Sequence, residues 1–134
     1  MPFDGRLNQG RFDAVEKLDR VVDLLATADR WCKGALVTRE GRRCIVGAMQ
    51  AVDAVGVLRR PVLLAIQEVT GRPYMSIEFF NDCASTTHAL VLDVLARTRA
   101  DLISGAIAWE APPAPPRGVC ARLGMLLRLG RVPA

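Results

Sequence analysis

Aromatic residues and histidine are scarce in this chain. Aromatic side chains make up only 5% of the 134 residues, and His88 is the sole histidine. Hydrophobic residues nevertheless amount to 51%, and a folded chain of this length buries roughly two-thirds of the surface that it exposes when unfolded. We therefore expect one domain with an aliphatic core that needs neither disulfides nor a metal ion.

Long hydrophobic runs are also lacking. None approaches the ~18 residues of a membrane span, and the opening residues MPFDGRLNQGRF hold no apolar stretch typical of a secretory signal. These absences predict a cytoplasmic protein with reduced cysteines. The four cysteines form no Cys-x-x-Cys pair, and a single histidine does not complete a common zinc set. We therefore expect no metal ion and no other cofactor.

Acidic residues are missing from the end of the chain. Residues 1–116 carry 14 acidic and 14 basic side chains, which cancel. Residues 117–134 contain no acid, and the whole net charge of +4 lies there. The four basic residues of this segment are Arg117, Arg122, Arg128 and Arg131. A domain whose acidic and basic charges cancel is not typical of nucleic-acid-binding proteins. We therefore expect a protein partner rather than nucleic acid or a membrane.

Three segments show helical spacing of apolar residues. Residues 13–31 carry a clear apolar stripe, and Asp13 with Glu16 resembles a capping box at its start. A second helix is predicted from about residue 44 to a stop at Gly56. The third, residues 85–107, is long and amphipathic. Helices therefore dominate the predicted structure.

Weaker signals fill the gaps between these segments. Residues 59–71 predict a short helix with Pro61 at its first position and Gly71 just past its end. Residues 72–80 leave room for one helical turn, and residues 35–45 for a short β-hairpin around a Glu-Gly turn. The predicted fold is a single all-α domain of four to five helices.

A proline-rich stretch separates this domain from the C-terminal segment. Residues 111–117 read APPAPPR, and proline there removes backbone donors and favours extended geometry. We expect a helical domain over residues 1–110, a linker over residues 111–117, and a basic amphipathic tail over residues 118–134.

Several short motifs resemble a known family. They are WCKG from Trp31, CIVGAM from Cys44, FFND ending at Asp82, and TTHALV from Thr86. The pattern is similar to that of a family of small bacterial and phage-borne domains of unknown function, over roughly residues 12 to 107. Phe80 stands where tryptophan is common in that family. The resemblance implies a helical fold and leaves the function open.

One catalytic hypothesis uses the cysteines and the lone histidine. Cys44 opens a predicted helix behind two arginines, a setting that lowers the pKa of a thiol. His88 would be its base, and Asn81 or Asp82 would orient the imidazole, as in acyl-transfer enzymes. The sequence does not show whether these groups meet. This arrangement of a cysteine hydrolase or transferase is therefore kept as the alternative.

The same residues have a structural interpretation, which we favour. Cys44 lies in an apolar run, where a free cysteine commonly serves as a small buried hydrophobe, and the following glycine and alanine suggest close packing against another backbone. His88 is explained by a neutral imidazole bonded to a backbone group. Asn81, Asp82, Ser85 and Thr86 are the residue types that cap helix N-termini.

The sequence therefore predicts a non-catalytic protein that acts through contact with another protein, as an accessory or regulatory module. The predicted binding residues are Trp31, Trp109 and the four tail arginines, because indole and guanidinium groups dominate many interfaces. Trp31 equally suits a place in the core. A homo-oligomer is compatible with this view, and weak nucleic-acid binding through the tail ranks third.

Overall fold

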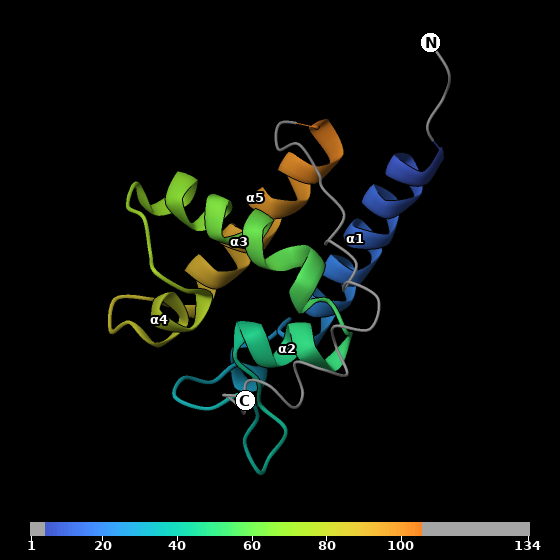
Figure 1. The fold of residues 1–134 in the computed structure, drawn as a ribbon. Coiled ribbons are helices and arrows are strands. Elements are labelled where there is room, and N and C mark those ends of the chain that lie inside the picture. Colours follow the sequence, from blue (N-terminus) through green and yellow to red (C-terminus); the bar gives the residue numbers. More distant parts are fainter. Residues whose placement is uncertain (1–4, 106–134) are drawn as a thin grey trace, which may run out of the picture.

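The computed structural model describes residues 5–105, with side chains from residue 10 onward. These residues form an all-α domain, as predicted (Figure 1). Its elements are α1 (Gly5–Leu24), the 3-10 helix η1 (Ala28–Arg30), α2 (Ile45–Ala51), α3 (Val55–Thr70), α4 (Ile77–Asp82) and α5 (His88–Ser104). The predicted linker and tail, residues 111–117 and 118–134, lie outside the described residues.

Helix α5 lies at the centre of the packing. It contacts α3 on one side and α1 on the other, while α2 and α4 gather at the end where α5 begins (Figure 1). The core between them is aliphatic, with Phe80 as its only fully buried aromatic residue among those described. The largest fully buried side chains include Leu18, Leu25, Ile45, Met49, Leu58, Ile66, Ile77, Leu95 and Leu102.

Helix α1 is placed differently from its prediction. It starts at Gly5 and ends at Leu24, so Asp13 lies inside the helix and does not cap it. The chain beyond Leu24 turns into η1 and then an extended segment at Trp31. The pattern suggested a longer helix because its apolar spacing continues to Leu25, which is buried but lies past the last helical residue.

The second predicted helix is also divided differently. Helix α2 stops at Ala51, and α3 begins at Val55, so Gly56 lies inside α3 and does not end a helix. Pro61 lies inside α3 as well, not at its first position. A proline there removes one backbone hydrogen bond of the helix, and its ring is buried in the core, which offsets part of that cost.

The end of α3 agrees with the sequence pattern, whereas α5 is shorter at both ends than the predicted residues 85–107. Gly71 and Gly105 are the C-caps of α3 and α5 and adopt left-handed backbone, each with φ of 77°. Residues 72–80 contain the start of α4, a short helix in place of the single turn predicted. The predicted hairpin over residues 35–45 is reduced to a turn with an isolated antiparallel bridge between Val37 and Arg43.

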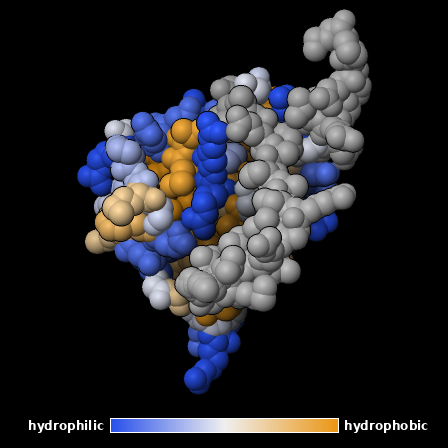
Figure 2. All heavy atoms as spheres, in the orientation of Figure 1, coloured by the Kyte–Doolittle hydropathy of each residue, from blue (hydrophilic) through white to orange (hydrophobic). Residues whose placement is uncertain are grey.

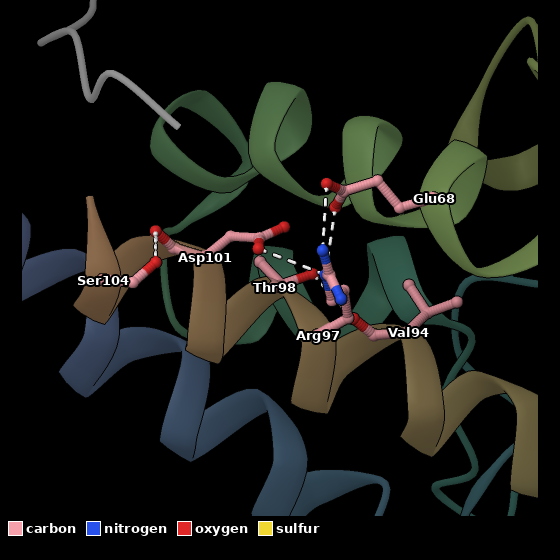
Figure 3. A network of polar contacts seen from close by, with 6 residues as sticks. All are labelled: Glu68, Val94, Arg97, Thr98, Asp101 and Ser104. Atoms are coloured by element: carbon pink, nitrogen blue, oxygen red, sulfur yellow. Dashed lines mark hydrogen bonds and ion pairs between the residues drawn. The ribbon is translucent and has the colours of Figure 1, made fainter. Parts of the chain in front are cut away.

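An ion-pair network joins α3 to α5 on the surface (Figure 3). The Arg97 guanidinium lies 3.4 Å from Glu68 Oε1 and 3.2 Å from Asp101 Oδ1. Asp101 is nearly buried. A side-chain hydrogen bond with Asp101 and, to a lesser degree, desolvation raise the pKa of Glu68, while Arg97 opposes this shift. Because both partners of the Arg97–Glu68 pair are partly exposed, the pair contributes little to the stability of the contact between α3 and α5.

Within residues 5–105, no helix combines the length and the apolar character required to cross a bilayer.

Candidate functional site

The polar residues at the end of α4 organise one end of the domain. Helix α4 is capped by Ser76, whose hydroxyl accepts a hydrogen bond from the Phe79 amide at 3.0 Å. Its last residues are Asn81 and Asp82. Because Phe80 is anchored in the core between them and the cap, the helix has a fixed rotation. The Asn81 amide therefore points inward, while Asp82 is exposed.

Asn81 is fully buried and bonded on both sides of its amide. Its Oδ1 accepts hydrogen bonds from the Trp31 indole at 2.8 Å and from the backbone N–H of Ile45 at 3.1 Å. Its Nδ2 donates to the carbonyl of Cys32 and to Asp82 Oδ1, both at 3.0 Å. A buried amide that is this well satisfied fixes the geometry of its surroundings. One side chain thus joins α4, the start of α2 and the segment that follows η1.

Further bonds fasten the loop after Trp31 to the end of α4. Asp82 Oδ1 also accepts from the Gly34 amide at 2.9 Å, and the Lys33 ammonium donates to the Cys83 carbonyl at 2.7 Å. Lys33 also lies 5.5 Å from the centre of the Trp31 ring, within range of a cation–π contact. The loop and the helix therefore form one rigid surface.

Two adjoining hollows open on this surface. The first has a volume of about 230 Å³ and is lined by Gly34, Ala35, Leu36, Cys44, Glu78 and Asp82. The second has a volume of about 330 Å³ and is lined by Ser76, Glu78, Phe79, Asp82 and Cys83. They share Glu78 and Asp82, and we call them together the α4 hollow.

Large apolar side chains are exposed around the α4 hollow. Leu36 is 43% exposed, Phe79 59% and Met75 90%. Figure 2 shows moderately hydrophobic atoms projecting at the left edge, where Figure 1 places α4 and the segment before it. Single exposed apolar residues are common, but here three of them lie in or next to the segments that line one hollow.

The charged side chains that line the α4 hollow are carboxylates. Glu78 is paired with Arg59 across 3.5 Å at a half-exposed position, where such a pair contributes little. Asp82 is held by the Gly34 and Asn81 bonds. No lysine or arginine appears among the lining residues of either hollow. Among the described lining residues, the only charged groups are therefore these two carboxylates, each of which already has a partner in the protein.

In the structure, the two main members of the catalytic hypothesis each have another hydrogen-bond partner. Cys44 is the N-cap of α2, 4% exposed, and its sulfur accepts from the Gly47 amide at 3.2 Å. The His88 Nε2 lies 2.7 Å from the Leu25 carbonyl, and its ring is 6.1 Å from that of Trp31. Within the described residues, no hydrogen bond or ion pair joins the thiol to the imidazole. His88 thus has the backbone partner that the structural interpretation expected.

Burial also changes the acidity of the thiols. Desolvation raises the pKa of Cys44 more than the helix N–H groups lower it, and desolvation likewise raises the pKa of Cys32. Cys83 is the opposite case, because hydrogen bonds from Ser85 lower the pKa of its thiol. The helix N-terminus therefore does not make Cys44 acidic, which was the premise of the nucleophile hypothesis.

A labelling experiment tests this order of reactivity. Since the thiolate reacts, a lowered pKa gives Cys83 more thiolate near neutral pH, and raised pKa values give Cys32 and Cys44 less. We expect iodoacetamide to label Cys83 at least about tenfold faster than Cys44 at pH 7. Peptide mass spectrometry across a pH series measures each rate. Faster labelling of Cys44 would contradict this assignment and favour the enzyme hypothesis.

The capping prediction identified the right region, but α5 begins three residues after the predicted start, and its cap was not among the predicted residues. The N-cap of α5 is Thr87, whose hydroxyl accepts from the Leu90 amide at 3.1 Å. Asn81 and Asp82 belong to α4 instead. Thr86 is buried and donates its hydroxyl proton to the Phe80 carbonyl at 2.7 Å. A threonine pair before a helix offers two candidates, and only the backbone geometry selects between them.

The predicted binding residues have a mixed outcome. Trp31 is half-buried, with its indole tied to Asn81, so it supports the α4 hollow from behind. Trp109 and the tail arginines (Arg117, Arg122, Arg128 and Arg131) lie outside the described residues, and their role stays a prediction. The sequence reasoning missed Leu36, Met75 and Phe79. Apolar residues in the connector before α4 were the signal that could have revealed the last two.

Comparison with curated proteins and with solved structures gave no significant match. The model of a family of unknown function does match, over residues 12–101, close to the extent over which the motifs suggested a resemblance. The match covers most of the described helices, including Trp31, Cys44 and the end of α4. The chain therefore belongs to the family of unknown function DUF6197.

Proposed function

We propose that this protein is a non-catalytic protein-interaction module, and that the α4 hollow binds a basic, apolar segment of a protein. The observation that carries this proposal is the composition of the hollow, with two carboxylates in its lining and Leu36, Met75 and Phe79 exposed around it. Apolar contacts would supply affinity, and the carboxylates would select a cationic sequence.

The rigidity of this surface supports the same function. The Asn81 bonds and the Asp82–Gly34 bond fix the relative position of loop and helix before a ligand arrives. Binding to a pre-formed surface does not incur the entropy cost of ordering it. An accessory or regulatory role fits a small module of this kind.

The chemistry of the site favours binding over catalysis. Cys44, the thiol in the first part of the hollow, has a raised pKa and is nearly buried. The imidazole that would serve as its base is engaged by a backbone carbonyl. Cys83 lines the second part but pairs with a serine hydroxyl rather than a general base.

Peptide binding tests the proposal directly. A fluorescent peptide that alternates arginine and leucine should bind the full chain, whereas its glutamate–leucine counterpart should not. Phe79→Ser should weaken binding by about tenfold, which corresponds to about 1.4 kcal/mol, because it removes an exposed apolar contact. Fluorescence anisotropy measures both affinities.

Phe12→Ser is the matched control. Phe12 is 67% exposed, similar to Phe79, but lies on α1, away from α4. Its substitution should leave peptide binding unchanged. Equal binding of the two peptides, or an equal loss in both variants, would show that the α4 hollow is not the binding surface.

A further inference from the structure

We infer that the segment that occupies the α4 hollow is the chain's own C-terminal segment, residues 117–134. This inference rests on the proposed function, because it names the ligand of the same surface. It makes the module self-occupied: a partner protein must displace the segment before it can bind.

Complementary chemistry is the first argument. The charged side chains in the lining of the hollow are the carboxylates Glu78 and Asp82, whereas residues 117–134 carry four arginines and no acid. Apolar residues alternate with these arginines in the sequence. They are Leu123, Met125, Leu126, Leu127 and Leu129. The segment therefore offers both cationic and apolar groups, which the carboxylates of the hollow and the exposed apolar residues around it can accept.

The length of the connecting chain is the second argument. Helix α5 has 17 residues and is about 25 Å long, and α4 lies near its first turn (Figure 1). A segment that leaves α5 at Gly105 must return along this length to reach the hollow. Residues 106–116 reach at most about 36 Å when extended, at about 3.3 Å per residue. The proline-rich sequence of residues 111–117 favours such an extended course.

Attachment to the same chain then determines occupancy. A short tether gives its end an effective concentration in the millimolar range. A segment with an intrinsic dissociation constant of about 0.1 mM would therefore occupy its own site about 90% of the time. The fraction of open sites, and with it the rate at which a reagent reaches the hollow, would fall about tenfold. A partner in trans must overcome this competition, so the tail sets the threshold for binding.

The thiol of Cys83 reports on occupancy, because it lines the hollow. We expect maleimide to label Cys83 about tenfold more slowly in the natural full chain than in a full chain with Arg117, Arg122, Arg128 and Arg131 changed to glutamate. A second variant, with Leu123, Leu126 and Leu127 changed to serine, should also label faster. Because this variant keeps the net charge, it separates exposure of the thiol from a direct electrostatic effect on the thiolate. Peptide mass spectrometry distinguishes Cys83 from Cys120.

Three outcomes decide the inference. Faster labelling of Cys83 in both variants supports occupancy by the chain's own segment, provided that the labelling rate in the natural chain does not depend on protein concentration. Protection that rises with protein concentration assigns the hollow to the segment of a second copy, and overturns the inference. Equal labelling in all three proteins also overturns it.

A synthetic peptide of residues 117–134 separates this inference from the proposed function. It is added to the full chain with the four arginine-to-glutamate changes. If the peptide binds and Phe79→Ser abolishes this binding, the proposed function is supported, even when Cys83 is unprotected in the natural chain. If neither this peptide nor the arginine–leucine peptide binds, the proposed function itself fails.

Discussion

Replacing Asn81 with leucine is expected to destabilise the domain by about 3–6 kcal/mol. Leucine is similar in size but leaves the Trp31 indole, the Ile45 amide and the Cys32 carbonyl without the partner that Asn81 provides. Each buried polar group left unsatisfied costs about 1–3 kcal/mol. Because the whole stability of a small domain is about 5–15 kcal/mol, this variant should be close to unfolding. Urea denaturation followed by circular dichroism measures the loss.

Asn81→Asp is the informative companion. It keeps the oxygen that accepts from Trp31 and Ile45 but loses the amide donor to Cys32. It also places a buried carboxylate beside Asp82, which raises the folded-state pKa of the new side chain. Its stability should therefore improve as the pH falls through that raised pKa toward the ordinary pKa of aspartate, while the leucine variant gains nothing in this range. A loss below about 1 kcal/mol in Asn81→Leu would show that the bonds of Asn81 are not important for stability.

The second large effect is expected at Gly47. Gly47 lies in α2 against the backbone of the loop that precedes this helix, so close that an added Cβ would lie 1.9 Å from the Leu36 carbonyl oxygen. The same oxygen accepts a hydrogen bond from the Cys44 amide at 3.2 Å. Gly47→Ala must therefore separate the helix from the loop, and overpacking of this kind typically costs about 1–3 kcal/mol, occasionally more. We expect about 3 kcal/mol in thermal or urea unfolding.

Gly41→Ala controls for the intrinsic cost of losing a glycine. Gly41 has φ of 90°, but a Cβ there meets nothing within 4 Å. Only the backbone penalty of roughly 1–2 kcal/mol remains. If Gly47→Ala were no more harmful than Gly41→Ala, the close contact with Leu36 would not be a constraint. The two variants should also differ in binding of the arginine–leucine peptide, because only Gly47→Ala displaces the part of the loop that lines the α4 hollow.

Much of the fold follows from patterns that act locally. Apolar spacing identifies helices α1, α2 and α5, and Gly71 marks the C-cap of α3 correctly. The expectation of close backbone packing beside Cys44 is confirmed by Gly47. The errors occur where tertiary contacts decide. The break at residues 52–54 and the tolerance of Pro61 inside α3 depend on what the core requires, which local propensity does not contain.

The candidate site was harder to predict from the sequence than the fold. Asn81 was identified as a notable residue, but its role as a junction requires three partners that lie 36 to 50 positions away in the chain. Sequence spacing says nothing about such contacts, so a capping role was the more economical prediction. Likewise, the exposure of Met75 and Phe79 depends on which face of α4 the buried Phe80 turns inward.

The loop between η1 and α2 is fastened at both of its ends. Cys32 and Gly34 are bonded to the Arg43 carbonyl and to Asp82, and Cys44 to the Leu36 carbonyl. The tip at residues 39–42 lies outside these fastenings and is exposed. Lengthening an exposed tip costs little, since loop-closure entropy grows slowly with length. This position therefore suits the insertion of an epitope or a fluorescent reporter, and natural length variation should concentrate there while the residues on either side keep their spacing.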